Sequence, residues 1–224
     1  MAIDFKDYPD DVLFLPLGGS NEIGMNLNLY RYKGKWLMVD MGIGFANDYL
    51  PGVEVLVPDI SFLEAHKDDI VGLLLTHAHE DHLGAVPYLW EEVGCPIYAT
   101  PFTASMLKTK LAMEKVNFKP PVHEVTPGMK LHIGPFDLEL IDLTHSIPEM
   151  QAVAIRTEKG TILHTGDWKL DPNPVIGPES NEALLSAYGE KGVLAIVCDS
   201  TNVFVEGISG SEGEVREELV KVIK

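Results

Sequence analysis

Apolar and polar residues follow one another in short blocks that predict strands divided by turns. Residues 12–17 and 70–75 are largely apolar runs, and the second has the continuous character of a strand buried on both faces. Residues 25–32 alternate between polar and apolar side chains, as a half-exposed strand does. Lys33 to Lys35 forms a turn into residues 36–40, so an antiparallel hairpin is expected.

The rest of the chain repeats this mixture of strands and helices. Further strands are predicted at 96–99, 130–133, 136–143, 151–157, 161–164 and 193–198, the last of them buried. Helices are predicted at 61–67, 83–90, 103–115, 181–188 and 211–224, and residues 42–59 are predicted to be a loop. The last helix opens with a capping box, Ser211 to Glu214. Antiparallel β-rich halves with helices outside predict an α/β fold, a layered α/β/β/α sandwich.

Composition limits the class of protein. The chain has 224 residues and is 46% hydrophobic, enough for one domain with a full core. Residues 1–11 are acidic and lack the apolar stretch of a signal peptide, and no run approaches the roughly 20 apolar residues of a membrane span. Cys95 and Cys198 are too few for a disulfide framework, which favours a reducing, cytoplasmic setting without a membrane.

The net charge of −17 bears on the possible partners. A protein that binds nucleic acid by itself normally has a basic patch, whereas this chain has 34 acidic and 17 basic residues. If the substrate is a polyanion, most of the binding must come from metal ions or from surface outside this chain. An acidic balance is otherwise usual for a soluble cytoplasmic protein.

Metal-binding side chains crowd the segment that follows the apolar run 70–75. They are His77, His79, Asp81 and His82. Imidazole nitrogens and carboxylate oxygens are ligands that zinc and similar divalent ions prefer. A single histidine beside an apolar strand is usually a packed or surface residue, but four such groups between a buried strand and a helix favour a metal site. One ion rarely uses four ligands so close in sequence, so two neighbouring ions are expected.

Two further candidate ligands each follow a predicted strand. His145 would complete a three-histidine site with His77 and His79, and Asp167 could bridge to a second ion. An aspartate after a glycine often only makes a turn. The order of these residues after the first cluster nevertheless favours metal binding. The predicted metal ligands are therefore His77, His79, Asp81, His82, His145 and Asp167.

These motifs, in this order, resemble the metallo-β-lactamase superfamily, whose fold is a four-layered αββα sandwich with a binuclear site at one edge. Further segments resemble bacterial ribonuclease J enzymes of the β-CASP group. These segments are 17–26, 39–42, 144–148, 165–171 and 199–202. The resemblance covers essentially the whole chain. It implies that Asp40 braces the metal loop without binding metal.

The resemblance implies a metal-dependent endonuclease and 5′→3′ exonuclease of RNA processing and decay. It implies two divalent ions, with zinc the first expectation and manganese or magnesium as alternatives. Asp81, His82 and Asp167 are the expected catalytic residues, because Asp81 and Asp167 would orient the attacking hydroxide. RNA is the expected substrate, and the complete enzyme is expected to be a homo-oligomer.

Ribonuclease J enzymes continue past segment 199–202 into an inserted β-CASP domain, and then return to finish the metallo-β-lactamase domain with a further metal-binding histidine. We therefore expect residues 1–202 to be the amino-terminal part of that domain, and residues 203–224 to begin the insertion. The chain is expected to be an amino-terminal portion that binds at least one ion but hydrolyses RNA poorly or not at all. His164, inside a predicted strand, is expected to be a core residue rather than a replacement ligand.

Two other functions stay open. A thioester or lactam hydrolase could use the same ligands, because the same hydroxide attacks a carbonyl carbon; segments 18–26 and 199–202 favour RNA. A metal-binding fragment without catalysis is favoured by the charge of −17 and by the absent carboxyl-terminal ligand.

Overall fold

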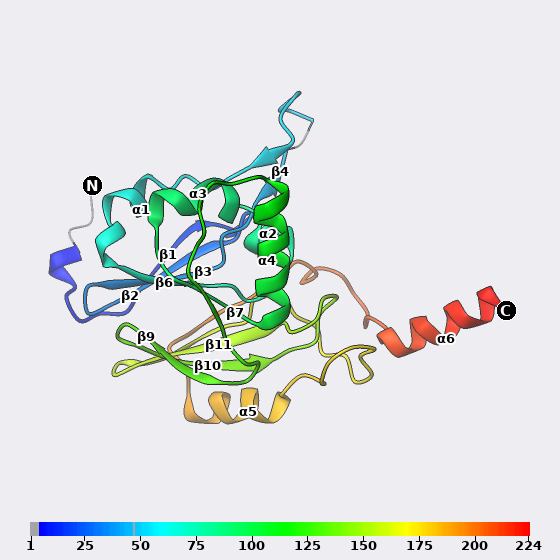
Figure 1. Ribbon diagram of the computed structural model, residues 1–224. Helices are drawn as coiled ribbons and strands as arrows, with labels where there is room; N and C mark the ends of the chain where they lie inside the picture. Colours follow the sequence, from blue (N-terminus) through cyan, green and yellow to red (C-terminus); the bar gives the residue numbers. More distant parts are fainter. Residues whose placement is uncertain (1–4, 47) are drawn as a thin grey trace.

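Two β-sheets lie face to face in the computed structural model, which describes residues 5–46 and 48–224 (Figure 1). The first four residues of the acidic opening segment and residue 47 of the predicted loop lie outside the described residues. The first sheet has the order β1-β2-β3-β6-β7-β8, with strands β1 (Leu13–Gly18), β2 (Leu27–Tyr32), β3 (Lys35–Val39), β6 (Ile70–Leu74), β7 (Ile97–Ala99) and β8 (Val122–Glu124). The second has the order β13-β12-β11-β10-β9, with strands β9 (Lys130–Ile133), β10 (Phe136–Asp142), β11 (Gln151–Thr157), β12 (Gly160–His164) and β13 (Ala195–Val197). A separate small hairpin pairs β4 (Gly44–Phe45) with β5 (Val55–Leu56).

Helices cover the outer face of each sheet, which gives four layers (Figure 1). The helices are α1 (Ser61–Ala65), α2 (Glu80–Leu83), α3 (Val86–Val93), α4 (Pro101–Met113), α5 (Glu182–Lys191) and α6 (Glu212–Ile223), with 3₁₀ turns at Phe5–Asp7 and Lys67–Asp69. α1, α3 and α4 share an apolar cluster with the first sheet, and α5 packs on the second sheet through Tyr188. The expected α/β/β/α sandwich is confirmed.

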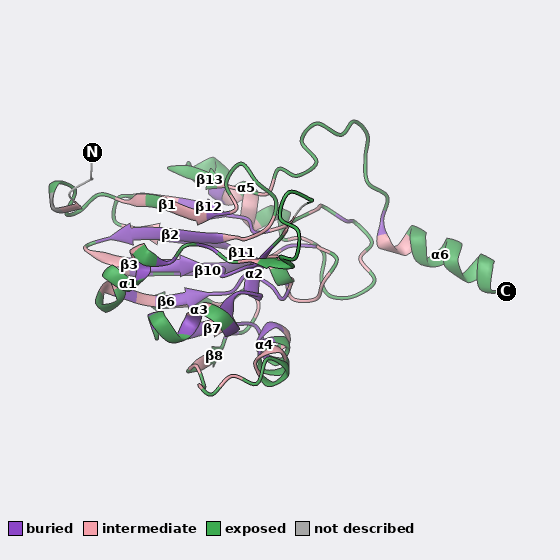
Figure 2. Ribbon diagram, turned by 90° about the horizontal axis from the view of Figure 1, so that it is seen from above, coloured by how far each residue is buried: buried purple, intermediate pink, exposed green. Residues whose placement is uncertain are grey.

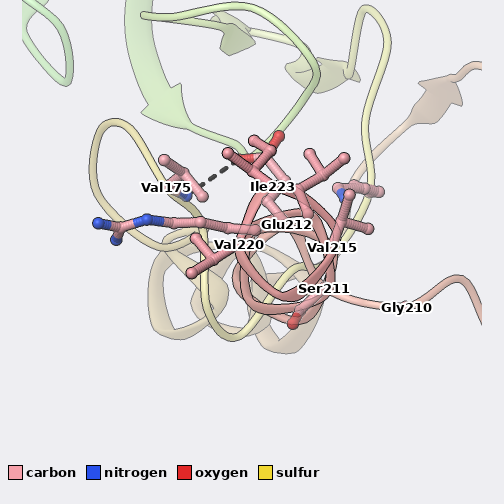
Figure 3. Close-up of a pocket in the computed structure, with 10 residues that line it drawn as sticks. Val175, Gly210, Ser211, Glu212, Val215, Val220 and Ile223 are labelled. Carbon is pink, nitrogen blue, oxygen red and sulfur yellow. Dashed lines mark hydrogen bonds between the residues drawn. The ribbon is translucent and has the colours of Figure 1, made fainter.

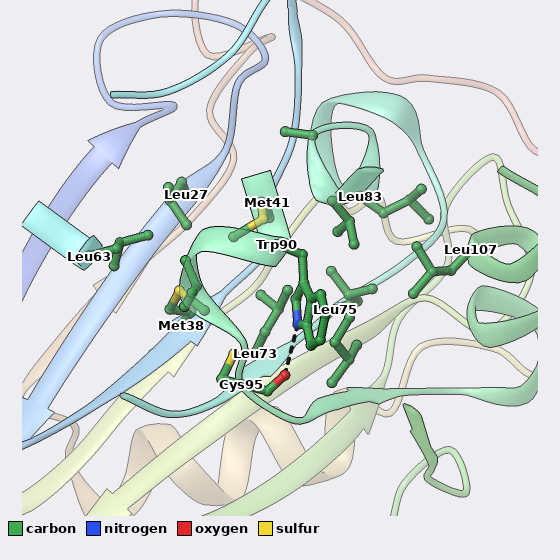
Figure 4. Packing of buried hydrophobic residues seen from close by; sticks show 14 of the residues in the cluster. Leu27, Met38, Met41, Leu63, Leu73, Leu75, Leu83, Trp90, Cys95 and Leu107 are labelled. Carbon is green, nitrogen blue, oxygen red and sulfur yellow. Dashed lines mark hydrogen bonds between the residues drawn. The ribbon is translucent and has the colours of Figure 1, made fainter. Parts of the chain in front are cut away.

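Apolar side chains from the two inner faces form the central core. Tyr30 and Leu74 of the first sheet belong to the same buried cluster as Phe136 of the second. Outside the first sheet, Trp90 of α3 is buried and its Nε1 donates to the carbonyl oxygen of Cys95 at 2.8 Å (Figure 4). Each large apolar side chain buried in this way contributes about 1.5–3 kcal/mol. The strands are thereby held firmly, and so are the loops that leave their ends.

The burial of β2 differs from the expectation of a half-exposed strand. All six of its residues are buried, because β2 pairs with β1 on one side and β3 on the other and has packed faces. Its polar members find partners inside the protein. Arg31, for example, donates from Nη1 to the carbonyl oxygen of Tyr8 at 2.7 Å. The alternation of polar and apolar residues therefore misled the prediction.

Several other expectations also need correction. β13 is not buried: it is the edge strand of its sheet, Ile196 within it is 58% exposed, and the preceding Leu194 is 56% exposed. The first sheet is mixed rather than antiparallel, because β3, β6, β7 and β8 run parallel to one another. The segment 42–59 is not all loop, since it contains β4 and β5, and β8 was not predicted.

α6 extends away from the sandwich (Figures 1 and 2). Its predicted capping box is present: the Ser211 hydroxyl accepts from the Glu214 N–H, and the Glu214 carboxylate accepts from the Ser211 N–H. The apolar side chains of its carboxyl-terminal half stay open to solvent, Leu219 being 56% and Ile223 82% exposed. The helix is thus held at its start and uncovered along its length. No helix within the described ranges is long and apolar enough to cross a membrane.

In a monomer, amide hydrogens of α6 are expected to exchange much faster than those of β6. A helix of 12 residues is marginal when little packs against it, whereas β6 is hydrogen-bonded on both sides. Native-state hydrogen exchange measures both. Equal protection of the two elements would contradict this description of α6.

Candidate metal centre

The six predicted ligands come from both sheets and meet at one edge of the sandwich. His77 and His79 lie in the connection that follows β6, and Asp81 and His82 lie in α2, which is a helical turn rather than the expected loop. From the second sheet, His145 follows β10 and Asp167 follows β12. The ligand atoms form two groups, each with all atoms within 4.8 Å of one another. The groups are His77, His79, His145 and Asp167, and Asp81, His82 and Asp167.

The first group is centred on His79. Its Nδ1 lies 3.0 Å from His77 Nε2 and 3.1 Å from His145 Nε2. His145 Nε2 is also 3.5 Å from Asp167 Oδ2. Nitrogens bound at about 2.1 Å to one tetrahedral zinc lie about 3.4 Å apart. The imidazoles therefore stand close to the spacing that a single ion requires.

The second group is centred on His82. Its Nε2 lies 3.1 Å from Asp167 Oδ1 and 3.6 Å from Asp81 Oδ2. Asp167 thus presents one carboxylate oxygen to His82 and the other to His145. This is the arrangement of a carboxylate able to bridge two cations, and it matches the bridging position expected from the sequence.

A buried carboxylate, Asp40, fixes the orientation of two of these imidazoles. Asp40 Oδ2 accepts from His82 Nδ1 at 2.7 Å, and Asp40 Oδ1 accepts from the Thr76 N–H at 2.8 Å. The Thr76 hydroxyl donates to Asp40 and lies 3.0 Å from His77 Nδ1, from which it can accept. His82 and His77 therefore both turn Nε2 toward the cluster. The supporting role implied for Asp40 agrees with this geometry.

Backbone hydrogen bonds clamp α2, which is too short to satisfy its own carbonyl groups. The carbonyl oxygens of Glu80, Asp81 and His82 accept from N–H groups of two neighbouring segments, at 3.0, 3.0 and 2.7 Å. The donors are Ile43, Asn26 and Met41, respectively. Gly42 lies so close to the carbonyl of Asp81 that a Cβ would overlap its carbon and oxygen. Segments 17–26 and 39–42 thus support the ligands of α2.

Asn26 is a site residue that the sequence analysis missed. Its Nδ2 donates to the carbonyl oxygen of Asp81 at 3.1 Å and lies 3.1 Å from His82 Nε2. Its side chain therefore borders the atoms of the second group. The only sequence signal was its place in segment 17–26, one of the segments that carry the family resemblance.

Burial and charge set the protonation of the cluster. Burial, reinforced by the neighbouring His82, holds the pKa of His77 well below its usual value, and burial also lowers the pKa of His79 and His145. Burial opposes the charge on His82 as well, but the carboxylates of Asp40 and Asp167 outweigh it and raise the pKa of His82 to about 10. Three imidazoles are therefore neutral and free to bind a cation near pH 7.

His164 is buried in β12, as expected for a core residue, and its Nδ1 lies 2.7 Å from the Tyr30 hydroxyl. Burial lowers the pKa of His164 from 6.5 to about 4. Between these pH values the unfolded chain binds a proton that the folded chain does not. The folded chain therefore keeps its full stability above pH 6.5 with respect to this group. As the pH falls toward 4, the free energy of unfolding decreases by about 3 kcal/mol because the unfolded chain gains the proton.

In the metal-free chain, His164→Asn is expected to reduce the decrease in the free energy of unfolding that occurs as the pH falls from 7 to 4. Urea unfolding between pH 7 and pH 4 measures the slope, with the exposed His132→Asn as the control. A wild-type slope in His164→Asn would show that His164 is not the group responsible.

The fold and the site define the class of protein. Residues 26–201 match the Metallo-beta-lactamase superfamily, and the chain belongs to that family. It is similar to Ribonuclease J of Sinorhizobium meliloti, at 48% identity over 218 residues, and of Thermus thermophilus, at 39% identity over 223 residues. These matches cover 96% of this chain and 39% of each relative, so the chain spans about two fifths of the length of these relatives.

Solved structures show the same fold at low sequence identity. A protein of unknown function from Enterococcus faecalis V583 superposes with a TM-score of 0.68 and 18% identity, covering 95% of this chain and 57% of that one. A metallo-β-lactamase from Cronobacter sakazakii gives a TM-score of 0.52 and 14% identity, covering 82% and 75%. At these identities the likeness concerns the fold alone.

Proposed function

We propose that the protein is a metal-dependent ribonuclease that cuts RNA internally and from the 5′ end, in RNA processing and decay in the cytoplasm. The observation that carries the proposal is the convergence of six ligand side chains on Asp167, which belongs to both groups. Sequence identity of 48% to a Ribonuclease J supports RNA as the substrate. Two divalent ions are proposed, with zinc preferred over manganese and magnesium because imidazoles dominate the first group.

The residues present suit this chemistry. The first ion would be held by His77, His79 and His145 and the second by Asp81 and His82, with Asp167 shared. When bound, such a pair supplies hydroxide near neutral pH and neutralises charge on the phosphate oxygens. In the neutral imidazole that would bind a cation, Asp40 keeps the proton of His82 on Nδ1, so that Nε2 faces the site. Asp81 and Asp167 are the carboxylates placed to accept hydrogen bonds from the attacking water and orient it.

The proposed ribonuclease is tested with a 5′-labelled, 5′-monophosphorylated RNA and zinc, manganese or magnesium. The 224-residue chain is expected to bind a divalent ion but to cleave RNA poorly or not at all, and a longer version that spans the full length of the relatives is expected to cleave well. His77→Ala should abolish both ion binding and cleavage, whereas His132→Ala, an exposed histidine outside the site, should abolish neither.

Nitrocefin and a glutathione thioester test the lactam and thioester alternatives in the same preparations. Faster turnover of either compound than of RNA, or RNA cleavage that survives His77→Ala, would reject the proposed ribonuclease. Ion binding without cleavage of any substrate by the natural protein would favour a metal-binding function, the alternative that the charge of −17 supports.

We also propose that residues 1–202 are the amino-terminal part of the metallo-β-lactamase domain and that residues 203–224 begin an inserted β-CASP domain. The family match ends at residue 201, and residues 203–210 are exposed and form neither helix nor strand, which supports this division. The complete enzyme is proposed to be a homo-oligomer.

A further inference from the structure

A buried carboxylate outside the ligand cluster joins three segments of the chain. The side chain of Asp171 is fully buried, and its Oδ2 lies 2.8 Å from Lys169 Nζ. The same oxygen accepts from the Glu212 N–H at 2.9 Å, and Oδ1 accepts from the Asn173 N–H at 2.9 Å. The ion pair with Lys169 holds the pKa of Asp171 at about 2, so the carboxylate is charged at neutral pH.

Asp171 is tied to the segment that carries His145. Its own N–H donates to the Thr144 hydroxyl at 3.0 Å, and this hydroxyl donates in turn to the Lys169 carbonyl oxygen. The Lys169 N–H donates to the Thr144 carbonyl oxygen at 3.0 Å, which completes an antiparallel bridge. Thr144 immediately precedes His145, and Lys169 comes two residues after Asp167. The bridge therefore fixes the separation of two ligands that come from different strands.

The other side of Asp171 holds the start of α6. The Glu212 N–H donates to the Asp171 carboxylate, and the Gly213 N–H donates to the Asn173 carbonyl oxygen at 3.0 Å. In addition, the Val175 N–H donates to Glu212 Oε2 at 3.0 Å (Figure 3). A carboxylate at the N-terminus of a helix also complements the helix dipole. The carboxylate of Asp171 therefore holds the start of α6 and pairs with Lys169, while the backbone N–H of the same residue contacts the bridge between the two ligand segments.

We propose that Asp171 is a positioning residue for His145 and Asp167, and that through it divalent-ion binding and the docking of α6 stabilise each other. This rests on the proposed metal-dependent function, because it requires that His145 and Asp167 bind the ion. The coupling is reciprocal: an ion that orders the bridge also orders the anchor of α6, and a docked α6 favours the ion by the same factor.

The test uses the 224-residue chain and cobalt(II) alone, whose visible absorption reports binding at nitrogen and oxygen ligands. Asp171→Asn removes the charge that pairs with Lys169 and is expected to weaken cobalt binding about 2–30-fold, the range for residues that lie between coupled sites. In hydrogen exchange, cobalt should increase the protection of the Glu212 and Gly213 amides in the wild type and not in Asp171→Asn. The matched control is Asp59→Asn, which removes an exposed carboxylate that accepts from the Ser61 N–H at the start of α1.

Thr144 gives an independent pair of variants should Asp171→Asn fail to fold. Thr144→Val, which loses the hydroxyl, should weaken cobalt binding, and Thr144→Ser, which keeps it, should restore binding. The inference would be overturned if Asp171→Asn bound cobalt with wild-type affinity and gained the same protection from cobalt as the wild type. If Asp171→Asn does not fold, the same result in Thr144→Val would overturn it. Either result would leave the proposed function standing. A wild-type chain that binds no divalent ion would overturn both.

Discussion

Asp40→Asn is expected to lower the affinity for the divalent ion by about 10–100-fold. The substitution keeps the size of the side chain, and asparagine tolerates the left-handed backbone at this position, where φ is 64°. In the wild type, the carboxylate accepts both from the Thr76 N–H and from His82 Nδ1. In the variant, an amide whose oxygen accepts from the Thr76 N–H turns its NH₂ group, a donor, toward His82 Nδ1. A neutral His82, the form that binds a cation, must then carry its proton on Nε2, the atom turned toward the cluster, or lose this hydrogen bond.

Calorimetric titration with zinc measures the affinity of Asp40→Asn, and thermal unfolding of the ion-free chain separates binding from folding. Asp69→Asn is the control, because its carboxylate forms only a surface ion pair with Lys35. Wild-type affinity in Asp40→Asn would show that the tautomer of His82 is set by something else.

Gly42→Ala is expected to destabilise the chain by about 3 kcal/mol and to weaken ion binding with it. The added Cβ overlaps the backbone carbonyl of Asp81, and no rotamer change can move a backbone group aside. The strain is therefore relieved only by displacing α2, which carries Asp81 and His82. Urea unfolding and zinc titration measure the two effects.

Gly189→Ala is the matched control, because a Cβ at Gly189 in α5 has no neighbour within 4 Å and alanine favours a helix. It should be neutral or slightly stabilising. If Gly42→Ala were equally harmless, α2 would not be held by the close approach described here.

The meeting of the candidate ligands was predictable because the segments that carry them follow strands whose apolar pattern is clear. His77 comes after the continuous run of β6, and His145 and Asp167 come after β10 and β12, so their meeting at one edge follows from the layered fold. The roles of Asn26 and Asp171 were not predictable in this way. Each depends on a backbone group, the carbonyl of Asp81 or the N–H of Glu212, that is brought near only by folding.

The errors in the fold prediction have a common physical origin. The alternation in β2 predicts a solvent-facing side, but the side chain of Arg31 reaches the carbonyl of Tyr8, and the strand has a neighbour on each side. The apolar residues around β13 predict burial, yet the strand lies at an edge and Ile196 is 58% exposed. The residue types of a strand indicate which environments the strand tolerates. The position of the strand in the sheet decides whether other elements cover it.

The ligand groups draw on both sheets, so a bound ion would act as a cross-link. His79 and His145 are 66 residues apart in the sequence but their ring nitrogens are 3.1 Å apart in space. Because the folded chain brings these nitrogens together and the unfolded chain does not, a bound ion would stabilise the folded sandwich. The sheets otherwise hold together largely through side-chain contacts across their core. Removing a bound ion with a chelator would therefore loosen the sandwich itself as well as empty the site.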